Sequence, residues 1–220
     1  MLKAQQCMRE ARLAALALLD PLYQYLRYSS VSRLLDTAPM RRLRFWIVPG
    51  MTASDVLGVI DTLGSHGISC WLVGGWGVDA LVRRQTRKHW DVDIAIDVSE
   101  RDRAVSALEK DGFTVLLQDT LPAWMPRIII LRDSRRRRVE LMPVDVPAPA
   151  AADETRPTAM QFRYTDDSFA EGMLAGRVIR CLSAPVQLLF HTGYPARSVD
   201  RRDVQVLTSY IGQLPQKEDS

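Results

Sequence analysis

The chain has 220 residues and a formal net charge of +3, and 47% of its residues are hydrophobic and 25% charged. This composition is typical of a globular protein and excludes a disordered chain, a collagen and a coiled-coil array. Residues 1–50 carry eight Lys/Arg and three Asp/Glu, whereas the rest carries 21 Lys/Arg and 23 Asp/Glu. The basic charge therefore belongs to the first segment and gives no general argument for nucleic-acid binding.

Membrane insertion and disulfide bonding are not expected. The longest apolar run, residues 13–19, ends at Asp20 and is much shorter than the ~18 residues that a membrane helix needs. The three cysteines, Cys7, Cys70 and Cys181, are far apart and form no C-x-x-C motif. Free thiols are typical of a reducing compartment, so we predict a cytoplasmic protein.

Residues 1–50 are predicted to form an N-terminal extension. Residues 11–19 favour a helix that Pro21 interrupts, and the Pro-Gly pair at 49–50 marks a break. A packing extension, or a translation start upstream of the true one at Met51, is the favoured interpretation. A docking arm or a basic nucleic-acid contact is the alternative.

Residues 51–146 are predicted to form a compact core of helices and strands. Thr52 or Ser54 is placed to cap a helix whose apolar residues recur at helical spacing. Ser99 is expected to cap a second long helix. The pattern predicts helices at 56–63, 76–82 and 100–110, and strands at 69–73, 91–97, 113–117, 127–131 and 138–144, with a hairpin turn at 133–136.

Residues 147–220 are predicted to form a smaller C-terminal part. The stretch 145–158 is rich in Pro and Ala and indicates a linker. A strand is expected at 178–182, followed by one helix that Ser183 caps and another that Asp200 caps. The mixture of elements predicts an α+β fold with helices packed on a mixed, twisted sheet.

The most informative strand alternates strictly between acidic and apolar residues over 91–97. Since successive side chains of a strand point to opposite faces, Asp91 and Asp93 share one face while Val92 and Ile94 occupy the other. The two carboxylates lie ~7 Å apart along the strand and suit Mg²⁺, which prefers oxygen ligands. The alternative is an edge strand whose Asp residues are simply solvated.

A glycine pair, Gly74 and Gly75, lies between a predicted strand and a predicted helix. Glycines at this place allow backbone N–H groups to approach a phosphate, and a helix N-terminus favours an anion. An ordinary tight turn is the alternative. Four cations lie between this pair and the acidic strand, where they would face a triphosphate or form a solvated helix end: Arg83, Arg84, Arg87 and Lys88.

Two of these stretches carry a resemblance to a known family. Residues 71–81 (WLVGGWGVDAL) and 85–97 (QTRKHWDVDIAID) resemble the lincosamide and 2''-aminoglycoside nucleotidyltransferases, a group of the DNA-polymerase-β-like superfamily. Residues 139–144 (VELMPV) resemble the strand with the family's third carboxylate. The resemblance covers residues 53–207 and implies the α+β nucleotidyltransferase fold, with the C-terminal part forming one wall of the acceptor cleft.

The resemblance also implies a mechanism. Asp91, Asp93 and Glu140 are expected to be catalytic and to bind metal, with two Mg²⁺ ions bridging the phosphates of a nucleoside triphosphate. Glu140 would accept the proton of the acceptor hydroxyl. ATP is the favoured donor, and the acceptor is a small antibiotic-like molecule, with nucleic acid not favoured. The expected nucleotide-binding residues are Gly74, Gly75, Trp76, Arg87, Lys88 and His89.

Some positions depart from the family pattern. Trp76 follows the glycines where a serine is common in the superfamily, and Glu140 stands where aspartate is common. Met142 replaces a frequent histidine, and Trp90 precedes the first aspartate. These differences concern turnover rate and acceptor choice more than the fold.

Two other functions remain as alternatives. A toxin-like nucleotidyltransferase would modify RNA or protein and use the basic extension and Arg135–Arg138 as acceptor contacts. A non-catalytic nucleotide-binding module would not need the three intact carboxylates. His191, Tyr194 and Trp124 are expected to have structural roles.

Overall fold

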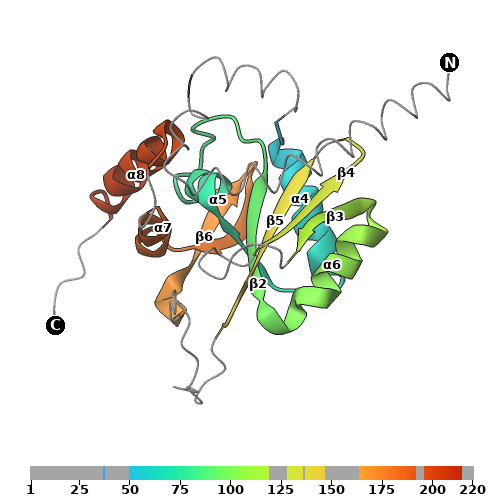
Figure 1. Cartoon of the computed structure of the whole chain (residues 1–220). Helices are drawn as coiled ribbons and strands as arrows, with labels where there is room; N and C mark the ends of the chain where they lie inside the picture. The colour runs from blue at the N-terminus through green and yellow to red at the C-terminus, as the bar shows by residue number, and fades with distance from the viewer. Residues whose placement is uncertain are drawn as a thin grey trace.

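The computed structural model describes residues 50–118, 128–135, 137–146, 164–191 and 196–214, together with Thr37 (Figure 1). Apart from Thr37 and Gly50, the predicted N-terminal extension lies outside the described residues. So do Trp124 and Tyr194, and most of the predicted linker.

The described strands form one mixed seven-stranded sheet with the order β3-β4-β5-β2-β1-β7-β6. The β2–β5 and β1–β7 pairs are parallel, and the other neighbours are antiparallel. This sheet confirms the predicted α+β class. The strands are β1 (Cys70–Val73), β2 (Val92–Asp97), β3 (Phe113–Gln118), β4 (Ile129–Asp133), β5 (Arg138–Val144), β6 (Phe169–Leu174) and β7 (Arg177–Leu182).

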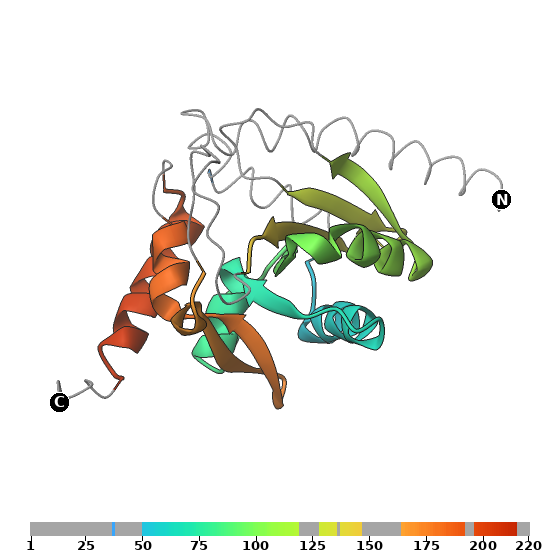
Figure 2. The ribbon, with the colours of Figure 1, turned by 90° about the horizontal axis from the view of Figure 1, so that it is seen from below.

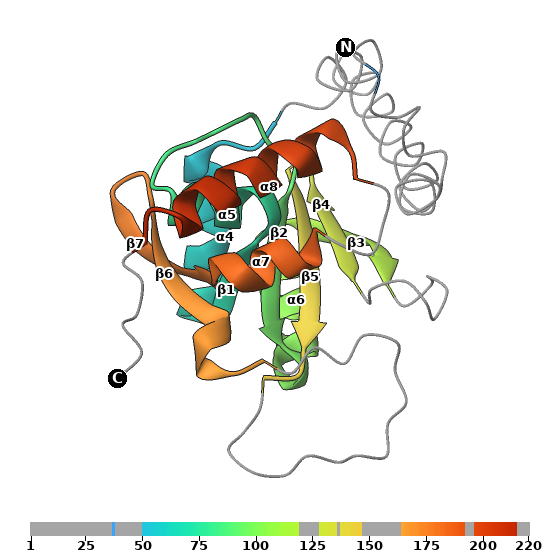
Figure 3. The same ribbon diagram turned by 90° about the vertical axis from the view of Figure 1, so that its left-hand side faces the viewer.

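The helices lie in two groups. Helices α4 and α6 lie next to each other on one side of the molecule, and α7 and α8 lie together on the other (Figures 1 and 2). Helix α8 also contacts α5 and crosses it (Figure 3). The helices are α4 (Ala53–Ser65), α5 (Gly74–Leu81), α6 (Arg101–Lys110), α7 (Ala184–Phe190) and α8 (Ser198–Ile211), with 3₁₀ turns at Val98–Glu100 and Asp166–Ser168.

The alternation predicted for β2 is confirmed. Val92, Ile94 and Ile96 are fully buried in the main hydrophobic core, which also contains buried residues of α4 and α6. Asp91 and Asp93 are only half-buried. The apolar half of β2 therefore anchors the strand in the core and leaves its acidic half at the opposite face of the sheet.

Two of the four predicted helix caps lie at the N-cap position, and two are wrong. Ser183 is the N-cap residue of α7, although its side chain makes no capping hydrogen bond. Thr52 caps α4 and forms a reciprocal capping box with Asp55. Ser99 instead lies inside a 3₁₀ turn, where its N–H donates to Asp97 Oδ1 at 2.8 Å. Asp200 lies in the first turn of α8, and its carboxylate accepts from the N–H of the N-cap residue Arg197 at 2.8 Å. In both cases a carboxylate bonds a backbone N–H that the local pattern did not identify.

The C-terminal strands belong to the same sheet as the core. Strand β6, which the sequence patterns did not predict, pairs with β7, and β7 pairs with β1 through Leu72 and Cys181. Ala175 (φ 47°) and Gly176 (φ 81°) form the two-residue hairpin turn between β6 and β7. The sheet thus continues across the boundary that we predicted at residue 146.

Candidate active site

Strand register brings the acidic strand beside two other predicted site elements. On one side of β2, Asp93 lies opposite Glu140 of β5 in a parallel pair. On the other side it lies opposite Val73, the last residue of β1 before the glycines. Adjacent strands are ~4.8 Å apart, and register-matched residues point to the same face. Asp93 therefore lies between Glu140 and the first two residues of α5, Gly74 and Gly75. We call these two residues the glycine turn.

Gly74 is required by both its backbone and its surroundings. Its φ of +58° lies in the left-handed region that favours glycine. A Cβ at this position would collide with Oδ2 of Asp93. The backbone of the glycine turn therefore lies directly against the carboxylate of the acidic strand.

Gly75 leaves space for two side chains that follow later in the sequence. A Cβ here would collide with Nη2 of Arg87 and with Nδ1 of His89. From the sequence, a glycine is expected here because it would allow a phosphate to approach the backbone N–H groups. The structure adds a second reason, because the missing side chain allows Arg87 and His89 to pack on the turn.

His89 is held in a buried polar network around Asp79 of α5. His89 Nε2 lies 2.5 Å from Asp79 Oδ2, while Asp79 Oδ1 accepts from the backbone N–H and the hydroxyl of Thr86 at 2.9 and 2.6 Å. Asp79 and His89 are 1% and 2% exposed. The ring of Trp76 packs against His89 with centroids 4.5 Å apart. His89 and Trp76 therefore lie in the interior behind the glycine turn.

Arg87 forms a fork-shaped ion pair with α8. Its Nε and Nη2 donate to Oδ1 and Oδ2 of Asp203 at 3.0 and 2.7 Å. Burial lowers the pKa of Arg87, but the hydrogen bonds and charge of Asp203, with the charges of Asp91 and Asp79, raise it overall. Arg87 is thus a half-buried, permanently charged guanidinium close to the glycine turn, whereas Lys88 is exposed.

Sequence reasoning missed Asp79 and Asp203. The available signal for Asp79 was an ionisable residue among the apolar residues of a short predicted helix, where a buried carboxylate needs a partner. Asp203 lies within residues 53–207, which the family resemblance covers. No local sequence pattern predicts its contact with Arg87, which precedes it by 116 residues.

Glu140 is buried and forms an ion pair. Glu140 Oε1 lies 2.7 Å from Nη2 of Arg138, two residues earlier on β5, and both side chains are nearly inaccessible. Within the described part of the chain, no three His, Cys, Asp or Glu side chains are grouped so that they would hold a metal by themselves. The pairing of β2 with β5 sets Asp93 beside Glu140, and Asp91 directly precedes β2.

The basic run at 135–138 does not form an open cationic surface over its described members. Arg137 Nε lies 2.7 Å from Asp133 Oδ2, and the Arg137 guanidinium lies over the ring of Phe113. Arg135 lies 3.8 Å from the same carboxylate. These pairs compensate the charge locally, which weakens the case for a nucleic-acid contact at this turn.

His191 has the features of a structural residue. Its Nδ1 lies 3.9 Å from Oδ1 of Asp200, and burial lowers its pKa although the charges of Asp203 and Asp200 act in the opposite direction. A largely inaccessible histidine side chain packed beside α8 agrees with the structural role that we expected.

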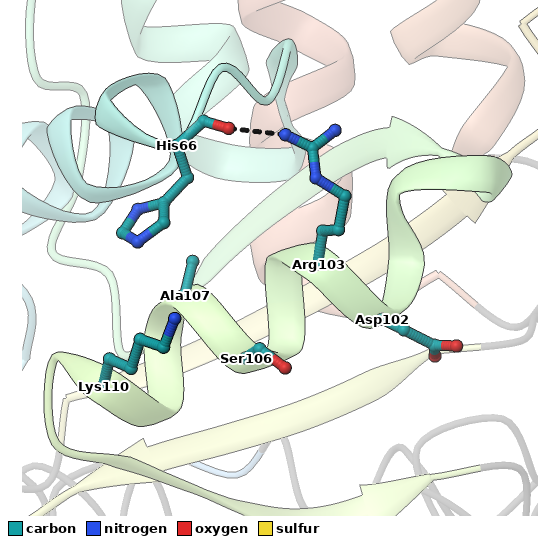
Figure 4. Close-up of a pocket in the computed structure, with 6 residues that line it drawn as sticks. All are labelled: His66, Asp102, Arg103, Ser106, Ala107 and Lys110. Carbon is teal, nitrogen blue, oxygen red and sulfur yellow. Dashed lines mark hydrogen bonds between the residues drawn. The ribbon is translucent and has the colours of Figure 1, made fainter.

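A pocket on the surface of α6 is separate from this site. Arg103 reaches across it and donates to the backbone oxygen of His66 at 2.7 Å (Figure 4). No predicted site residue is among its lining residues, which are His66, Asp102, Arg103, Ser106, Ala107 and Lys110. We assign it no part in the chemistry.

Comparison with known proteins decides the family. The sequence profile described as aminoglycoside-2''-adenylyltransferase matches residues 55–207, well over half of the chain. The chain belongs to this family. The matched segment contains the glycine turn, the acidic strand, Glu140 and Asp203, so all the residues discussed above lie within it.

Two curated relatives belong to the two enzyme groups that the resemblance named. A lincosamide resistance protein of Staphylococcus haemolyticus is 28% identical over 159 residues, which is 72% of this chain and 96% of the relative. A 2''-aminoglycoside nucleotidyltransferase of Escherichia coli is 25% identical over 139 residues, or 57% of this chain and 64% of the relative. The match to the first relative therefore extends over almost its whole length.

Solved structures support the same fold. The lincomycin-bound lincosamide adenylyltransferase LnuA aligns with a TM-score of 0.60 and 27% identity, over 73% of this chain and 99% of that one. The aminoglycoside enzyme ANT(2'')-Ia, in complex with adenylyl-2''-tobramycin, aligns with a TM-score of 0.55 and 19% identity over 73% and 89% of the two chains. The protein is thus a nucleotidyltransferase in fold and enzyme class. None of the helices formed by the described residues has the length and hydrophobicity needed to cross a membrane.

Proposed function

We propose that this protein transfers a nucleoside monophosphate, with ATP as the favoured donor, onto a hydroxyl group of a small antibiotic. A lincosamide is the first acceptor to test, because the lincosamide resistance relative is matched over nearly its whole length. An aminoglycoside is the second, since the match to that enzyme covers 64% of its length.

One observation carries the proposal. Asp93 lies in register with Glu140 on one side, and its carboxylate contacts the glycine turn on the other. A phosphate bound at the turn would therefore be adjacent to the acidic strand. This is the arrangement that metal-assisted phosphoryl chemistry requires, since the metal must contact both carboxylate and phosphate oxygens.

The donor atoms on β2 suit Mg²⁺. This ion is usually held by one or two carboxylates together with phosphate oxygens and water, so it does not need a complete protein cage. Asp91 and Asp93 are half-buried, share one face of the sheet and would supply these carboxylates. When bound, the ion would neutralise charge on the phosphates.

Glu140 is better suited to proton transfer than to metal binding. Its Oε1 already lies 2.7 Å from Nη2 of the buried Arg138, so a cation of the protein itself compensates its charge. A general base must reach the acceptor hydroxyl within about 2.6–3.2 Å or through one water. Glu140 lies in register with Asp93, so it is close to the place where the acceptor hydroxyl would meet a phosphate bound by the acidic strand.

The test is pyrophosphate release by the full chain, with each of the four nucleoside triphosphates and Mg²⁺, against lincosamides and aminoglycosides. We expect release that depends on the acceptor, with a product whose mass increases by one nucleotide. Transfer to RNA or protein, with growth arrest on expression that requires Asp93, would instead establish the toxin-like function. Hydrolysis without any acceptor would contradict both.

A further inference from the structure

We propose that Asp203 of α8 is a positioning residue for the nucleotide donor, because it holds the Arg87 guanidinium against the glycine turn. This inference rests on the function proposed above. It gives the C-terminal helix a role on the donor side of the site, in addition to any contribution to the acceptor cleft.

The contact has the geometry of a specific bidentate pair. Two guanidinium nitrogens of Arg87 donate to the two carboxylate oxygens of Asp203 at 3.0 and 2.7 Å. The side chain of Asp203 is 1% exposed and that of Arg87 is 17% exposed. Because both groups are planar, a fork of this kind fixes the direction of the guanidinium as well as its distance.

The fixed guanidinium lies at the predicted phosphate site. Nη2 of Arg87, which binds Asp203, is also an atom that a Cβ on Gly75 would strike. The guanidinium therefore lies beside the glycine turn, within electrostatic range of Asp91. A cation held there is placed to meet the negative charge of a triphosphate.

Helix α8 contacts the same segment at a second point. Nη2 of Arg202 donates to the backbone oxygen of Thr86 at 2.7 Å. Thr86 in turn donates twice to Asp79 of α5. The residues just before the acidic strand are thus held between α5 and α8, which lie against each other (Figure 3).

A pre-oriented cation binds phosphate at a lower entropic cost. A mobile arginine side chain loses conformational entropy when it binds a phosphate. The side chain of Arg87 is already ordered by its ion pair with Asp203, so this loss is smaller. Without Asp203, Arg87 would keep its positive charge, but its guanidinium would no longer be held in one orientation. Nucleotide affinity should therefore fall, while the acceptor is bound as before.

The experiment compares Asp203→Asn with Asp61→Asn in the full chain. Asp61 accepts a second bidentate arginine fork, from Arg177 at 2.7 and 2.9 Å, but at an exposed site between α4 and β7. Dissociation constants for MgATP are measured by titration, and KM values for nucleotide and acceptor by pyrophosphate release. For Asp203→Asn we expect about 10–100-fold weaker nucleotide binding, by analogy with the loss of a group that orients a metal ligand. Asp61→Asn should bind as the unmodified chain does.

Two further variants separate positioning from folding. Arg87→Lys keeps the charge and loses the fork, so it should fold and still bind nucleotide about tenfold or more weakly. The double variant Arg87→Asp with Asp203→Arg can restore the ion pair but places a carboxylate at the glycine turn. We expect it to regain thermal stability without regaining nucleotide binding.

Several results would overturn the inference. Nucleotide binding that returns with stability in the double variant, or unchanged binding by a folded Arg87→Lys, would make the pair a purely structural brace. If the unmodified chain binds MgATP but transfers nothing to any acceptor, the proposed function fails, and the titrations still test Asp203. If transfer is normal and Asp203→Asn binds MgATP as tightly as the unmodified chain, only the role of Asp203 is wrong.

Discussion

Asp93 and Glu140 lie side by side on parallel strands β2 and β5, although α6, β3 and β4 separate them in the chain. Strand β2 has Glu140 on one side and the glycine turn on the other, so a single strand brings the candidate residues together. Substitutions along β2 and β5 can therefore test the site without removing any other element.

Asp93→Asn should keep the fold and abolish transfer. The amide preserves the shape but removes a charge next to Asp91 and Glu140, so stability of the unliganded chain should hold or rise. Activity should fall by more than tenfold in Mg²⁺, because a metal-binding carboxylate is lost. The measurements are thermal unfolding and pyrophosphate release.

Asp97→Asn is the matched control for Asp93→Asn. Asp97 lies on the same strand and shares its face, but its Oδ1 caps the 3₁₀ turn by accepting from Ser99. Asparagine keeps that acceptor, so both stability and transfer should stay near those of the unmodified chain. Transfer by Asp93→Asn within tenfold of the original rate would disprove its assignment to metal binding.

Glu140→Gln should slow the chemical step by roughly 10²–10⁴, the usual contribution of a general base. Nucleotide affinity should change little, because Asp91 and Asp93 remain. The change also leaves Arg138 without its ion-pair partner in a buried site, so folding must be checked by circular dichroism. Single-turnover transfer, measured beside MgATP titration, separates chemistry from binding. Unchanged chemistry would point to attack without a base, whereas lost nucleotide binding would make Glu140 a metal ligand.

Gly75→Ala should destabilise the chain. The new methyl group would meet Arg87 and His89, and Asp79 holds His89 in place. Forcing an extra carbon into a packed site costs about 1–3 kcal/mol. Gly58→Ala in α4 is the control, since no atom lies within 4 Å of its added Cβ, and it should raise stability by about 0.4–1 kcal/mol. Equal melting temperatures for the two variants would show that a methyl group fits at position 75 without displacing Arg87 or His89.

The thiols of Cys70 and Cys181 should react slowly in the folded protein. Burial raises the pKa of Cys70 to about 11 and that of Cys181 to about 12. The thiolate is the reactive form, so at pH 8 only about one Cys70 side chain in a thousand is reactive. The alkylation rate should therefore rise about tenfold for each unit increase in pH. Alkylation by iodoacetamide is followed at each cysteine by peptide mass spectrometry, with the chain in guanidinium chloride as the control. Rapid native alkylation at pH 8 would contradict the raised pKa values of the two thiols.

Local patterns predicted the elements whose residues repeat regularly. The apolar period of α4, the alternation of β2 and the bounds of β5 are all confirmed, because a helix or strand buries one side and shows that side in the sequence. Strand β6 was missed because an edge strand needs less apolar alternation and derives its pairing from β7. The caps at Ser99 and Asp200 were wrong because a 3₁₀ turn at Val98–Glu100 precedes α6 and because α8 begins two residues before Asp200.

The sequence alone determined the fold class, the glycine turn, the acidic strand and the nucleotidyltransferase resemblance, because each depends on a local pattern of residues that are close together in the chain. Only the tertiary structure showed why Gly75 has no side chain and which group holds Arg87. Asp203 follows Arg87 by 116 residues, and their ion pair exists because α8 packs across α5. Contacts of this kind depend on how completed elements pack, and hydrophobic periodicity contains no information about which charged residue of one element will meet which residue of another.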